Sequence, residues 1–262
     1  MFPIRILSLY SGSTGNSFLI ATPNGSILID AGKSAKQLCK TLAQANVPPE
    51  DIKAILITHE HSDHISALPV FLKKYPIPVH LPTGCVYKLI GEPSVSPLLC
   101  PHPPVFTQEL CGMRITSFPT PHDSRASVGY RFECFEEDSP HTFCFGYATD
   151  IGYVSNEVES ALTGCNAVIL ESNHDPEMLM FGPYPYQLKQ RISSRYGHLS
   201  NNESALLAAR LCAAGTKSLM LAHLSQENNT PDLAFSECLG AVADDTVRIC
   251  IAHPDNITEL PV

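Results

Sequence analysis

Residues 54–64 read AILITHEHSDH, an apolar run followed at once by three histidines and an aspartate. The whole chain holds 11 histidines in 262 residues, so this density is far beyond chance. Neutral imidazole and carboxylate are ligands that suit zinc, manganese or iron, and the segment offers no thiolate. It is not the helical His-Glu-x-x-His motif of zinc proteases, because Asp63 stands where that motif has its second histidine. The pattern predicts a metal-binding segment of another kind.

The apolar run Ala54–Ile57 predicts a buried strand, and Thr58–His61 is expected to continue it. Residues two apart in extended backbone share a face, so His59 and His61 can hold one ion together. On a helix the same two side chains would point about 200° apart and would not converge.

A helix is expected to begin near Ile65, with Ser62 as its cap. Asp63 and His64 would then lie in the turn, free to face a second ion beside the first. The alternative interpretation is a histidine-rich surface turn that binds metal adventitiously.

Four ligands do not complete two metal sites, so further ligands must come from distant parts of the chain. His122, Asp150 and His223 each follow directly after an apolar run. The carboxyl ends of strands are where α/β folds usually place their chemistry. Three recurrences of this pattern downstream of the histidine segment indicate that these residues complete the site.

The first half of the chain is rich in short strand patterns, and the last third alternates strands with helices. This order predicts an α/β fold of two packed sheets with helices outside. We find no repeat or linker, which favours a single domain over residues 1–262. Residues 93–104, rich in proline, predict an irregular excursion. The strands are expected at Ile4–Leu9, Phe18–Ala21, Ile27–Asp30, Ala54–Ile57, Ile115–Phe118, Val128–Phe132, Thr142–Tyr147, Ala167–Leu170, Leu219–Ala222 and Val247–Ile251. The helices are expected at Ser34–Ala45, Tyr186–Tyr196, Asn202–Ala213 and Leu233–Val242, the last with Thr230 as its N-cap.

Composition limits the classes of function. The ten cysteines form no Cys-x-x-Cys pair, which favours free thiols in a reducing compartment. No apolar run approaches the roughly 18 residues of a membrane span, and the first residues lack a secretion-signal pattern. We therefore expect a cytoplasmic protein with no membrane partner. A net charge of −9 with 17 Lys plus Arg argues against a broad basic surface for duplex DNA, although it permits a local groove.

The His-x-His-x-Asp-His string, with Asp30-Ala31-Gly32 before it and the three distant residues after it, resembles the metallo-β-lactamase superfamily. The resemblance implies an αββα sandwich and two divalent ions, with zinc, manganese or iron as the metal. It implies that Asp30 supports a ligand from beneath the site. In the implied ligand set, one ion takes His59, His61 and His122, the other takes Asp63, His64 and His223, and Asp150 bridges them.

Longer strings resemble the WalJ-like branch of that superfamily, whose members are described as DNA exonucleases. These strings lie at residues 11–17 (SGSTGNS), 28–31 (LIDA), 58–65 (THEHSDHI), 150–153 (DIGY), 171–175 (ESNHD), 197–201 (GHLSN) and 222–225 with Asn228-Asn229. The resemblance implies a phosphodiesterase, more narrowly a 5′–3′ DNA exonuclease, in which a hydroxide held between two ions attacks the phosphorus. Nucleic acid or another phosphodiester would be the substrate. The alternatives are a glyoxalase-II-like thioesterase, a small-molecule cyclic phosphodiesterase, and a metal-binding interaction protein without catalysis.

Two further histidines are candidate catalytic residues beside Asp150. His198 lies between two expected helices, where it would contact the phosphate or protonate the leaving group, or simply cap a helix. His174 follows an expected strand and would contact substrate, or be fixed structurally by Glu171.

Three other groups of residues have less specific interpretations. Gly12, Gly15 and Asn16 resemble a phosphate-binding loop but lack the Gly-Lys-Ser/Thr ending of a P-loop. They predict a tight hairpin turn, with a contribution to the rim of the site as a second interpretation. Lys189, Arg191 and Arg195 are expected on one helix, as a phosphate-contact patch or as a solvated face. The histidines without partners in the sequence pattern are His80, His102, His141 and His253.

Overall fold

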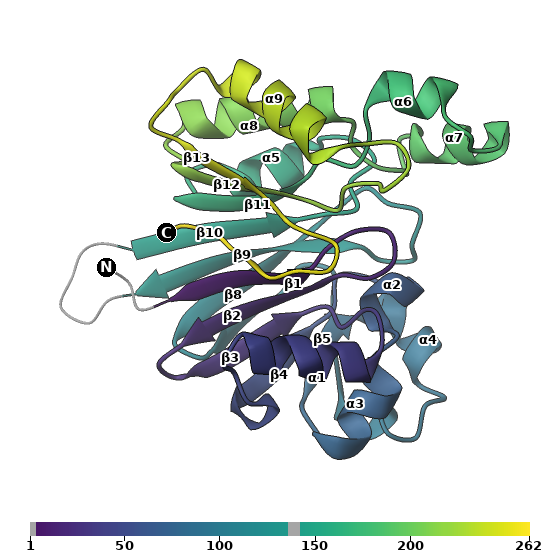
Figure 1. Ribbon diagram of the computed structural model, residues 1–262. Helices are drawn as coiled ribbons and strands as arrows, with labels where there is room; N and C mark the ends of the chain where they lie inside the picture. The colour runs from purple at the N-terminus through teal and green to yellow at the C-terminus, as the bar shows by residue number, and fades with distance from the viewer. Residues whose placement is uncertain (1–3, 136–141) are drawn as a thin grey trace.

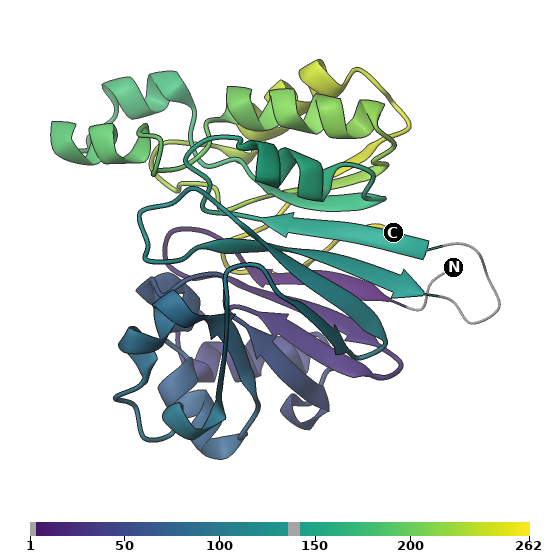
Figure 2. The ribbon, with the colours of Figure 1, turned by 180° about the vertical axis from the view of Figure 1, so that it is seen from behind.

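The computed structural model describes residues 4–135 and 142–262. Within this part of the chain, two mixed seven-stranded sheets lie face to face with helices on their outer faces (Figures 1 and 2). The first sheet, in spatial order, is β14 (Thr258–Glu259), β1 (Arg5–Tyr10), β2 (Ser17–Thr22), β3 (Gly25–Ile29), β4 (Ile52–Leu56), β5 (Val79–Pro82) and β6 (Leu99–His102). The second is β13 (Arg248–Ile251), β12 (Ser218–Ala222), β11 (Ala167–Glu171), β10 (Thr142–Ala148), β9 (Val128–Phe135), β8 (Met113–Pro119) and β7 (Thr107–Leu110). The predicted sandwich of two mixed sheets with flanking helices is confirmed.

Helices from the first half of the chain accompany the first sheet, and helices from the second half accompany the second (Figure 1). The former are α1 (Ala35–Gln44), α2 (Ser62–Ile65), α3 (Leu68–Lys74) and α4 (Val86–Leu89). The latter are α5 (Asn156–Leu162), α6 (Pro176–Phe181), α7 (Tyr186–Ile192), α8 (Asn201–Ala213) and α9 (Pro231–Val242). Short 3-10 turns lie at Pro49–Asp51, Thr83–Cys85 and Ser96–Leu98. The predicted N-cap of α9 is confirmed, because the Thr230 side chain accepts a hydrogen bond from the backbone of Leu233.

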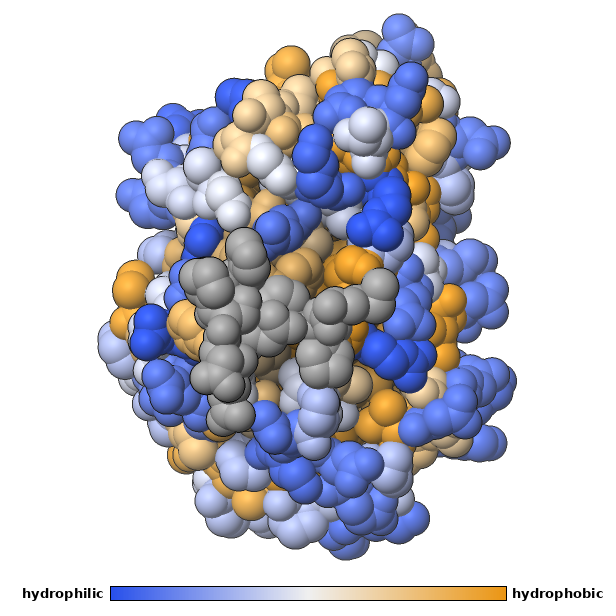
Figure 3. Space-filling model, turned by 90° about the vertical axis from the view of Figure 1, so that its left-hand side faces the viewer, coloured by the Kyte–Doolittle hydropathy of each residue, from blue (hydrophilic) through white to orange (hydrophobic). Residues whose placement is uncertain are grey.

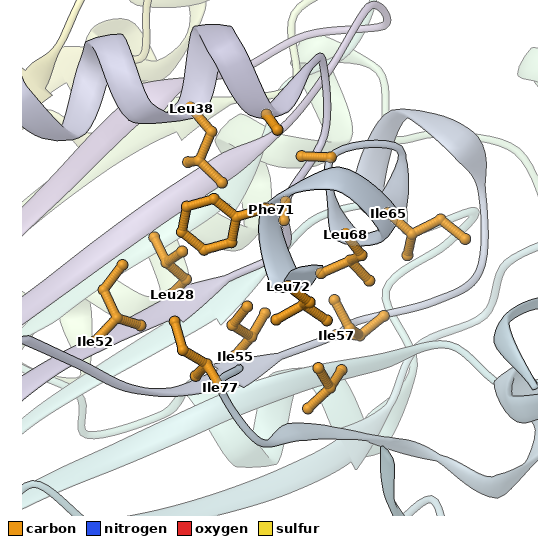
Figure 4. Close-up of a cluster of buried hydrophobic side chains, with 14 of the residues drawn as sticks. Leu28, Leu38, Ile52, Ile55, Ile57, Ile65, Leu68, Phe71, Leu72 and Ile77 are labelled. Atoms are coloured by element: carbon orange, nitrogen blue, oxygen red, sulfur yellow. The ribbon is translucent and has the colours of Figure 1, made fainter. Parts of the chain in front are cut away.

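Three apolar clusters fill the spaces between the layers. The cluster between the sheets joins Phe18 and Ile27 from the first sheet to Tyr130 and Phe145 from the second. A second cluster lies between the first sheet and its helices, where Phe71 of α3 packs among aliphatic side chains of the strands (Figure 4). The third lies between the second sheet and α5, α8 and α9. Because β11 and β12 have apolar layers on both faces, all their residues are buried, which explains their continuous apolar runs.

Three predictions of local structure are wrong. Residues 93–104 are not wholly irregular, because β6 pairs in parallel with β5. The helix expected at Tyr186–Tyr196 ends at Ile192, where the chain turns back to pack the carbonyl of Arg195 against Gly152. The strand expected to continue through His61 ends at Leu56, for a reason given with the site.

None of the helices in residues 4–135 and 142–262 combines the length and the apolar character that a membrane crossing requires. The edge of the sandwich on the left of Figure 1 carries mostly hydrophilic residues with apolar ones scattered among them (Figure 3). All ten cysteines are free, as predicted.

Gly32 packs closely against the backbone of Asp63 in α2, and replacing it tests this contact. A Cβ atom at this position would lie 1.9 Å from the carbonyl oxygen of Asp63 and 2.6 Å from the backbone nitrogen of Asn16. We predict that Gly32→Ala lowers the free energy of unfolding by roughly 2–3 kcal/mol, because two backbone segments must move apart. Urea denaturation followed by circular dichroism measures this change.

The matched control is Gly240→Ala in α9, where an added Cβ meets no atom within 4 Å. We expect this variant to be as stable as the parent or more stable by up to about 1 kcal/mol, since alanine favours helix. Equal stability of the two variants would contradict the tight contact at Gly32.

Candidate metal centre

The carboxyl ends of strands from both sheets meet at one edge of the sandwich, on the right of Figure 1. In the first sheet β3 and β4 run parallel, and in the second β10, β11 and β12 run parallel. β8 points the same way as β10, because each is antiparallel to β9. The residues that follow these strands are those singled out from the sequence, and the structure brings all seven predicted ligands together here.

His59, His61 and His122 form the first group, with one nitrogen of each ring within 4.8 Å of the others. The His122 Nε2 atom lies 3.3 Å from His61 Nδ1. Asp63, His64 and His223 form the second group by the same measure. In that group, Asp63 Oδ2 lies 3.2 Å from His64 Nε2 and 3.7 Å from His223 Nε2.

Asp150 lies between the two groups. Its Oδ1 atom is 3.8 Å from His122 Nε2 in the first group, and its Oδ2 atom is 3.4 Å from His64 Nε2 in the second. The carboxylate is buried, and Oδ1 also lies 3.5 Å from His223 Nδ1, so Asp150 lies within 4 Å of residues from both groups. This is the arrangement that a bridging ligand requires.

The other nitrogen of most of these rings is held from behind. His64 Nδ1 lies 2.8 Å from Asp30 Oδ2, and His122 Nδ1 lies 3.0 Å from the carbonyl of Gly197. His59 Nδ1 lies 3.0 Å from the hydroxyl of Thr58. Such partners fix which nitrogen faces the site and how each ring is turned.

Asp30 also explains why β4 ends early. Its carboxylate accepts the backbone N–H of Thr58 at 2.8 Å and the Thr58 hydroxyl at 2.8 Å. The backbone N–H of Thr58 is therefore bonded to a side chain, and its carbonyl accepts the N–H of Val128 in the other sheet at 3.1 Å. Thr58 thus leaves the ladder of the first sheet, and His59 lies in a loop. The prediction that Asp30 supports the site from beneath agrees with these contacts.

The start of α2 differs from the prediction. The helix begins at Ser62 itself and has His61 at the N-cap position without a side-chain bond. Asp63 and His64 consequently lie within the helix and not in a turn before it. Their side chains still reach the second group, because they occupy its first turn beside Asp30.

Three residues at strand ends adopt left-handed backbone conformations, which non-glycine residues rarely adopt. The φ angles are 58° at Asp30, 58° at Asp150 and 57° at His223. Each residue costs about 1 kcal/mol or more in this conformation. The sharp turn directs each of these side chains into the site immediately after its strand.

Glu171 is a site residue whose main partners were not predicted from the sequence. Fixing His174 was one of two interpretations, whereas the Glu171 Oε1 atom lies 2.7 Å from His198 Nδ1 and 3.1 Å from His223 Nδ1. Its Oε2 atom accepts the backbone N–H of Ile151 at 2.7 Å. The signal was present, since Glu171 is a buried acid at the end of an apolar strand.

Asn16 contacts the centre as well as its own turn, which agrees with the interpretation that this loop contributes to the rim of the site. Its Nδ2 atom donates to the carbonyl of Gly12 at 3.1 Å and lies 3.2 Å from Asp63 Oδ2. Its Oδ1 atom accepts the N–H of Gly12 at 2.9 Å. The predicted glycine turn therefore holds an amide donor against a ligand carboxylate.

The two candidate catalytic histidines occupy different surroundings. His198 lies beside the centre, with ring centroids 5.1 Å from His122 and 5.2 Å from His223. His174 lies outside the four ligand groups found in the described residues and lines an apolar cavity of about 420 Å³ with Leu179 and Tyr186. Burial lowers the pKa of His174 to about 4, so its ring is neutral at physiological pH.

Carboxylates and imidazoles in the cluster shift one another's pKa. Burial disfavours the charged form of His223, but nearby carboxylates, led by Asp150, outweigh burial and raise its pKa to about 10. Burial also disfavours ionised Glu171, but His198 and His223 lower the pKa of Glu171 to about 2. His59 has no such excess of acid, and burial holds its pKa well below the ordinary value. The carboxylates therefore stay ionised and offer negative charge to cations.

The expected row of cations on one helix is not formed, because Arg195 lies beyond the end of α7. Lys189 donates to the carbonyl of Met180, and Arg191 pairs with Asp123 at 2.5 Å. Arg195 lies over the ring of Tyr153.

His80 and His102, which show no partners in the sequence pattern, lie together in the structure: their rings stack, and His80 Nδ1 lies 2.9 Å from His102 Nε2. His253 accepts backbone N–H groups of its own turn. His141 lies outside the described residues.

Comparisons with known proteins agree with this site. A family model described as a β-lactamase superfamily domain matches residues 26–224. Exodeoxyribonuclease WalJ of Streptococcus pneumoniae serotype 2 is 35% identical over 262 residues, which cover 96% of this chain and 95% of the relative. Exodeoxyribonuclease YycJ of Bacillus anthracis is 37% identical over 230 residues, which cover 86% of this chain and 84% of the relative.

Among solved structures, the metallo-β-lactamase fold protein YhfI of Bacillus subtilis superposes with a TM-score of 0.73 at 16% identity. The match covers 98% of this chain and 99% of YhfI, and it supports the fold alone. The fold and the extended sequence similarity lead to one assignment. The chain belongs to the metallo-β-lactamase-fold superfamily of metal-dependent hydrolases and, within it, to the family of WalJ- and YycJ-type proteins.

Proposed function

We propose that this chain uses two divalent ions to hydrolyse phosphodiester bonds of DNA from a strand end, with 5′–3′ polarity. The observation that carries the proposal is a set of buried ligand atoms without hydrogen-bond partners in the described part of the chain. These atoms are His59 Nε2, His223 Nε2 and Asp150 Oδ2. A buried polar atom left unpaired costs about 1–3 kcal/mol, and a cation at the centre would satisfy all three. The similarity to two exodeoxyribonucleases supports the choice of substrate.

The ligand groups support the assignment implied by the family resemblance. We propose that one ion is held by His59, His61 and His122, and the other by Asp63, His64 and His223, with Asp150 between them. Nitrogen and carboxylate donors without thiolates suit zinc or manganese, and iron is also compatible.

The bound ions would supply a strongly acidified water and positive charge beside the attacked phosphorus. The protein's own groups would orient the reacting parts. Glu171 holds His198 by Nδ1, which leaves Nε2 to contact a phosphate oxygen or to protonate the leaving oxygen. Asp150 would keep the two ion sites in register, because its carboxylate lies within 4 Å of residues from both groups. His174 would act at most as a substrate contact, from the neighbouring apolar cavity.

We also infer that residues 1–262 form one domain, because the core between the sheets joins strands from both halves of the chain. A cytoplasmic location stays a prediction.

The first prediction concerns Asp150. We expect Asp150→Ala to lower the content of both ions and to abolish metal-dependent hydrolysis, since both sites share this carboxylate. Plasma emission spectrometry measures the metal content, and bis-p-nitrophenyl phosphate reports turnover. Asp51→Ala, at an exposed 3-10 turn, is the matched control and should keep both. Full activity in Asp150→Ala would contradict the bridging role.

The second prediction concerns His198. We expect His198→Ala to keep the metal content of the parent and to lose kcat by about 10²- to 10³-fold, the usual contribution of a general acid. His253→Ala removes an exposed ring that accepts the backbone N–H groups of Asp255 and Asn256 in its own turn, and it should keep kcat. Loss of metal from His198→Ala would reassign the residue as a ligand.

The third prediction concerns the substrate. We expect the metal-loaded protein to degrade single- or double-stranded DNA labelled at the 5′ or 3′ end, releasing mononucleotides from one end. RNA, a cyclic dinucleotide and a glutathione thioester are assayed in parallel with zinc, manganese and iron. Preferential thioester hydrolysis would favour the glyoxalase-II-like alternative, and release of internal fragments would contradict exonuclease action.

A further inference from the structure

A cleft of about 690 Å³ opens beside the proposed ion sites. His61 and Asp63 form part of its lining, so the cleft reaches the centre itself. The remaining walls come from α4, from residues 123–125, and from α7 in the second half of the chain. Figure 1 shows α2, α4 and α7 at the same edge of the sandwich.

A flat cation–aromatic pair lines this cleft. The guanidinium carbon of Arg125 lies 3.7 Å from the centroid of the Tyr87 ring, and both side chains are exposed. Within residues 4–135 and 142–262, the Arg125 guanidinium has no ion-pair partner, and Lys88 beside it has none either. Arg125 and Lys88 are thus two basic side chains without ion-pair partners among the described residues, beside the planar ring of Tyr87, in a chain of net charge −9.

Glu60 fixes this pair to the metal-binding segment. Its Oε1 atom accepts the backbone N–H of Arg125 at 3.0 Å and the Tyr87 hydroxyl at 3.3 Å. Its Oε2 atom accepts the thiol of Cys85 at 3.2 Å. Glu60 stands between His59 and His61 in the chain, but its side chain is not part of the two candidate ligand groups. Its carboxylate instead positions Tyr87 and Arg125.

We propose that Tyr87 and Arg125 form a stacking platform for the nucleobase next to the scissile phosphodiester, with Lys88 facing the strand's phosphates. Aromatic rings and guanidinium planes are the surfaces on which proteins stack unpaired bases. The cleft has the volume for a nucleotide, and its floor is the site where the bond would be cut. This inference rests on the proposed function and names the nucleic-acid contact of that same site.

The test compares two oligonucleotides that differ only in an abasic residue, placed in turn at each position flanking the first bond cleaved. We expect kcat/KM of the parent protein to fall about 10-fold on the abasic substrate, because one base stack is lost. We define the intact-to-abasic ratio as kcat/KM on the intact oligonucleotide divided by kcat/KM on the abasic one. In Tyr87→Ala and Arg125→Ala this ratio should approach one. Arg114→Ala is the matched control, because Arg114 lies over Phe135 in another exposed pair, and β8 places it at the opposite end of the sheet from Pro119. It should keep the parental ratio.

A conservative variant separates stacking from charge. Arg125→Lys keeps the positive charge but not the planar face, so we expect its ratio to fall as in Arg125→Ala. If Arg125→Lys, or both alanine variants, keep the intact-to-abasic ratio of the parent protein, the stacking platform is wrong. The nuclease proposal is unaffected by that result.

Binding of a fluorescent single strand, measured by anisotropy in chelator, gives a readout that does not need turnover. If the parent cleaves no nucleic acid, the proposed function fails. The platform still stands in that case if Tyr87→Ala weakens binding by about 10-fold and Arg114→Ala does not. Absence of both cleavage and binding overturns both proposals.

Discussion

Two fully buried carboxylates hold the rest of the site in place. Asp30 follows β3 in the first sheet, and Glu171 ends β11 in the second. Asp30 binds one ligand histidine and the backbone that leads to the first group, whereas Glu171 binds His198 and His223. Burying an ionised acid is costly unless it is paired and hydrogen-bonded. Each acid is therefore stable in its ionised form only when the segments that donate hydrogen bonds to it are correctly placed. This requirement fixes the positions of these segments at the edge that the two sheets share.

The same edge stores conformational strain. Asp30, Asp150 and His223 adopt left-handed backbone, although residues of these types are more stable elsewhere in φ/ψ space. The surrounding apolar clusters supply enough stability to hold these turns. The consequence is that a side chain can point into the site from the first residue after a strand, and a fixed scaffold rather than a flexible loop positions the ligand atoms.

Net charge is a poor guide to what such a site can bind. The chain carries 26 acidic and 17 basic side chains, which argues against a broad surface for duplex DNA. At the cleft, however, Arg125 and Lys88 are uncommitted, and two bound divalent ions would add four positive charges. A cleft that joins these two side chains to the proposed ion sites suits a single strand end better than the side of a duplex.

The sequence by itself determined the residue types of the candidate metal centre, the paired sheets and the positions of most strands. Continuous apolar runs, and polar residues directly after them, can be recognised from neighbouring residues alone. It also identified all the residues that the structure gathers into the two groups, since a histidine segment of this density has few other uses. It did not determine the end of β4, the start of α2 or the partner of Glu171. Those features depend on hydrogen bonds between residues far apart in the chain, such as Thr58 with Asp30 and Glu171 with His198. Tertiary structure alone decided them, because a buried polar group bonds to whichever partner the packed sheets bring within reach.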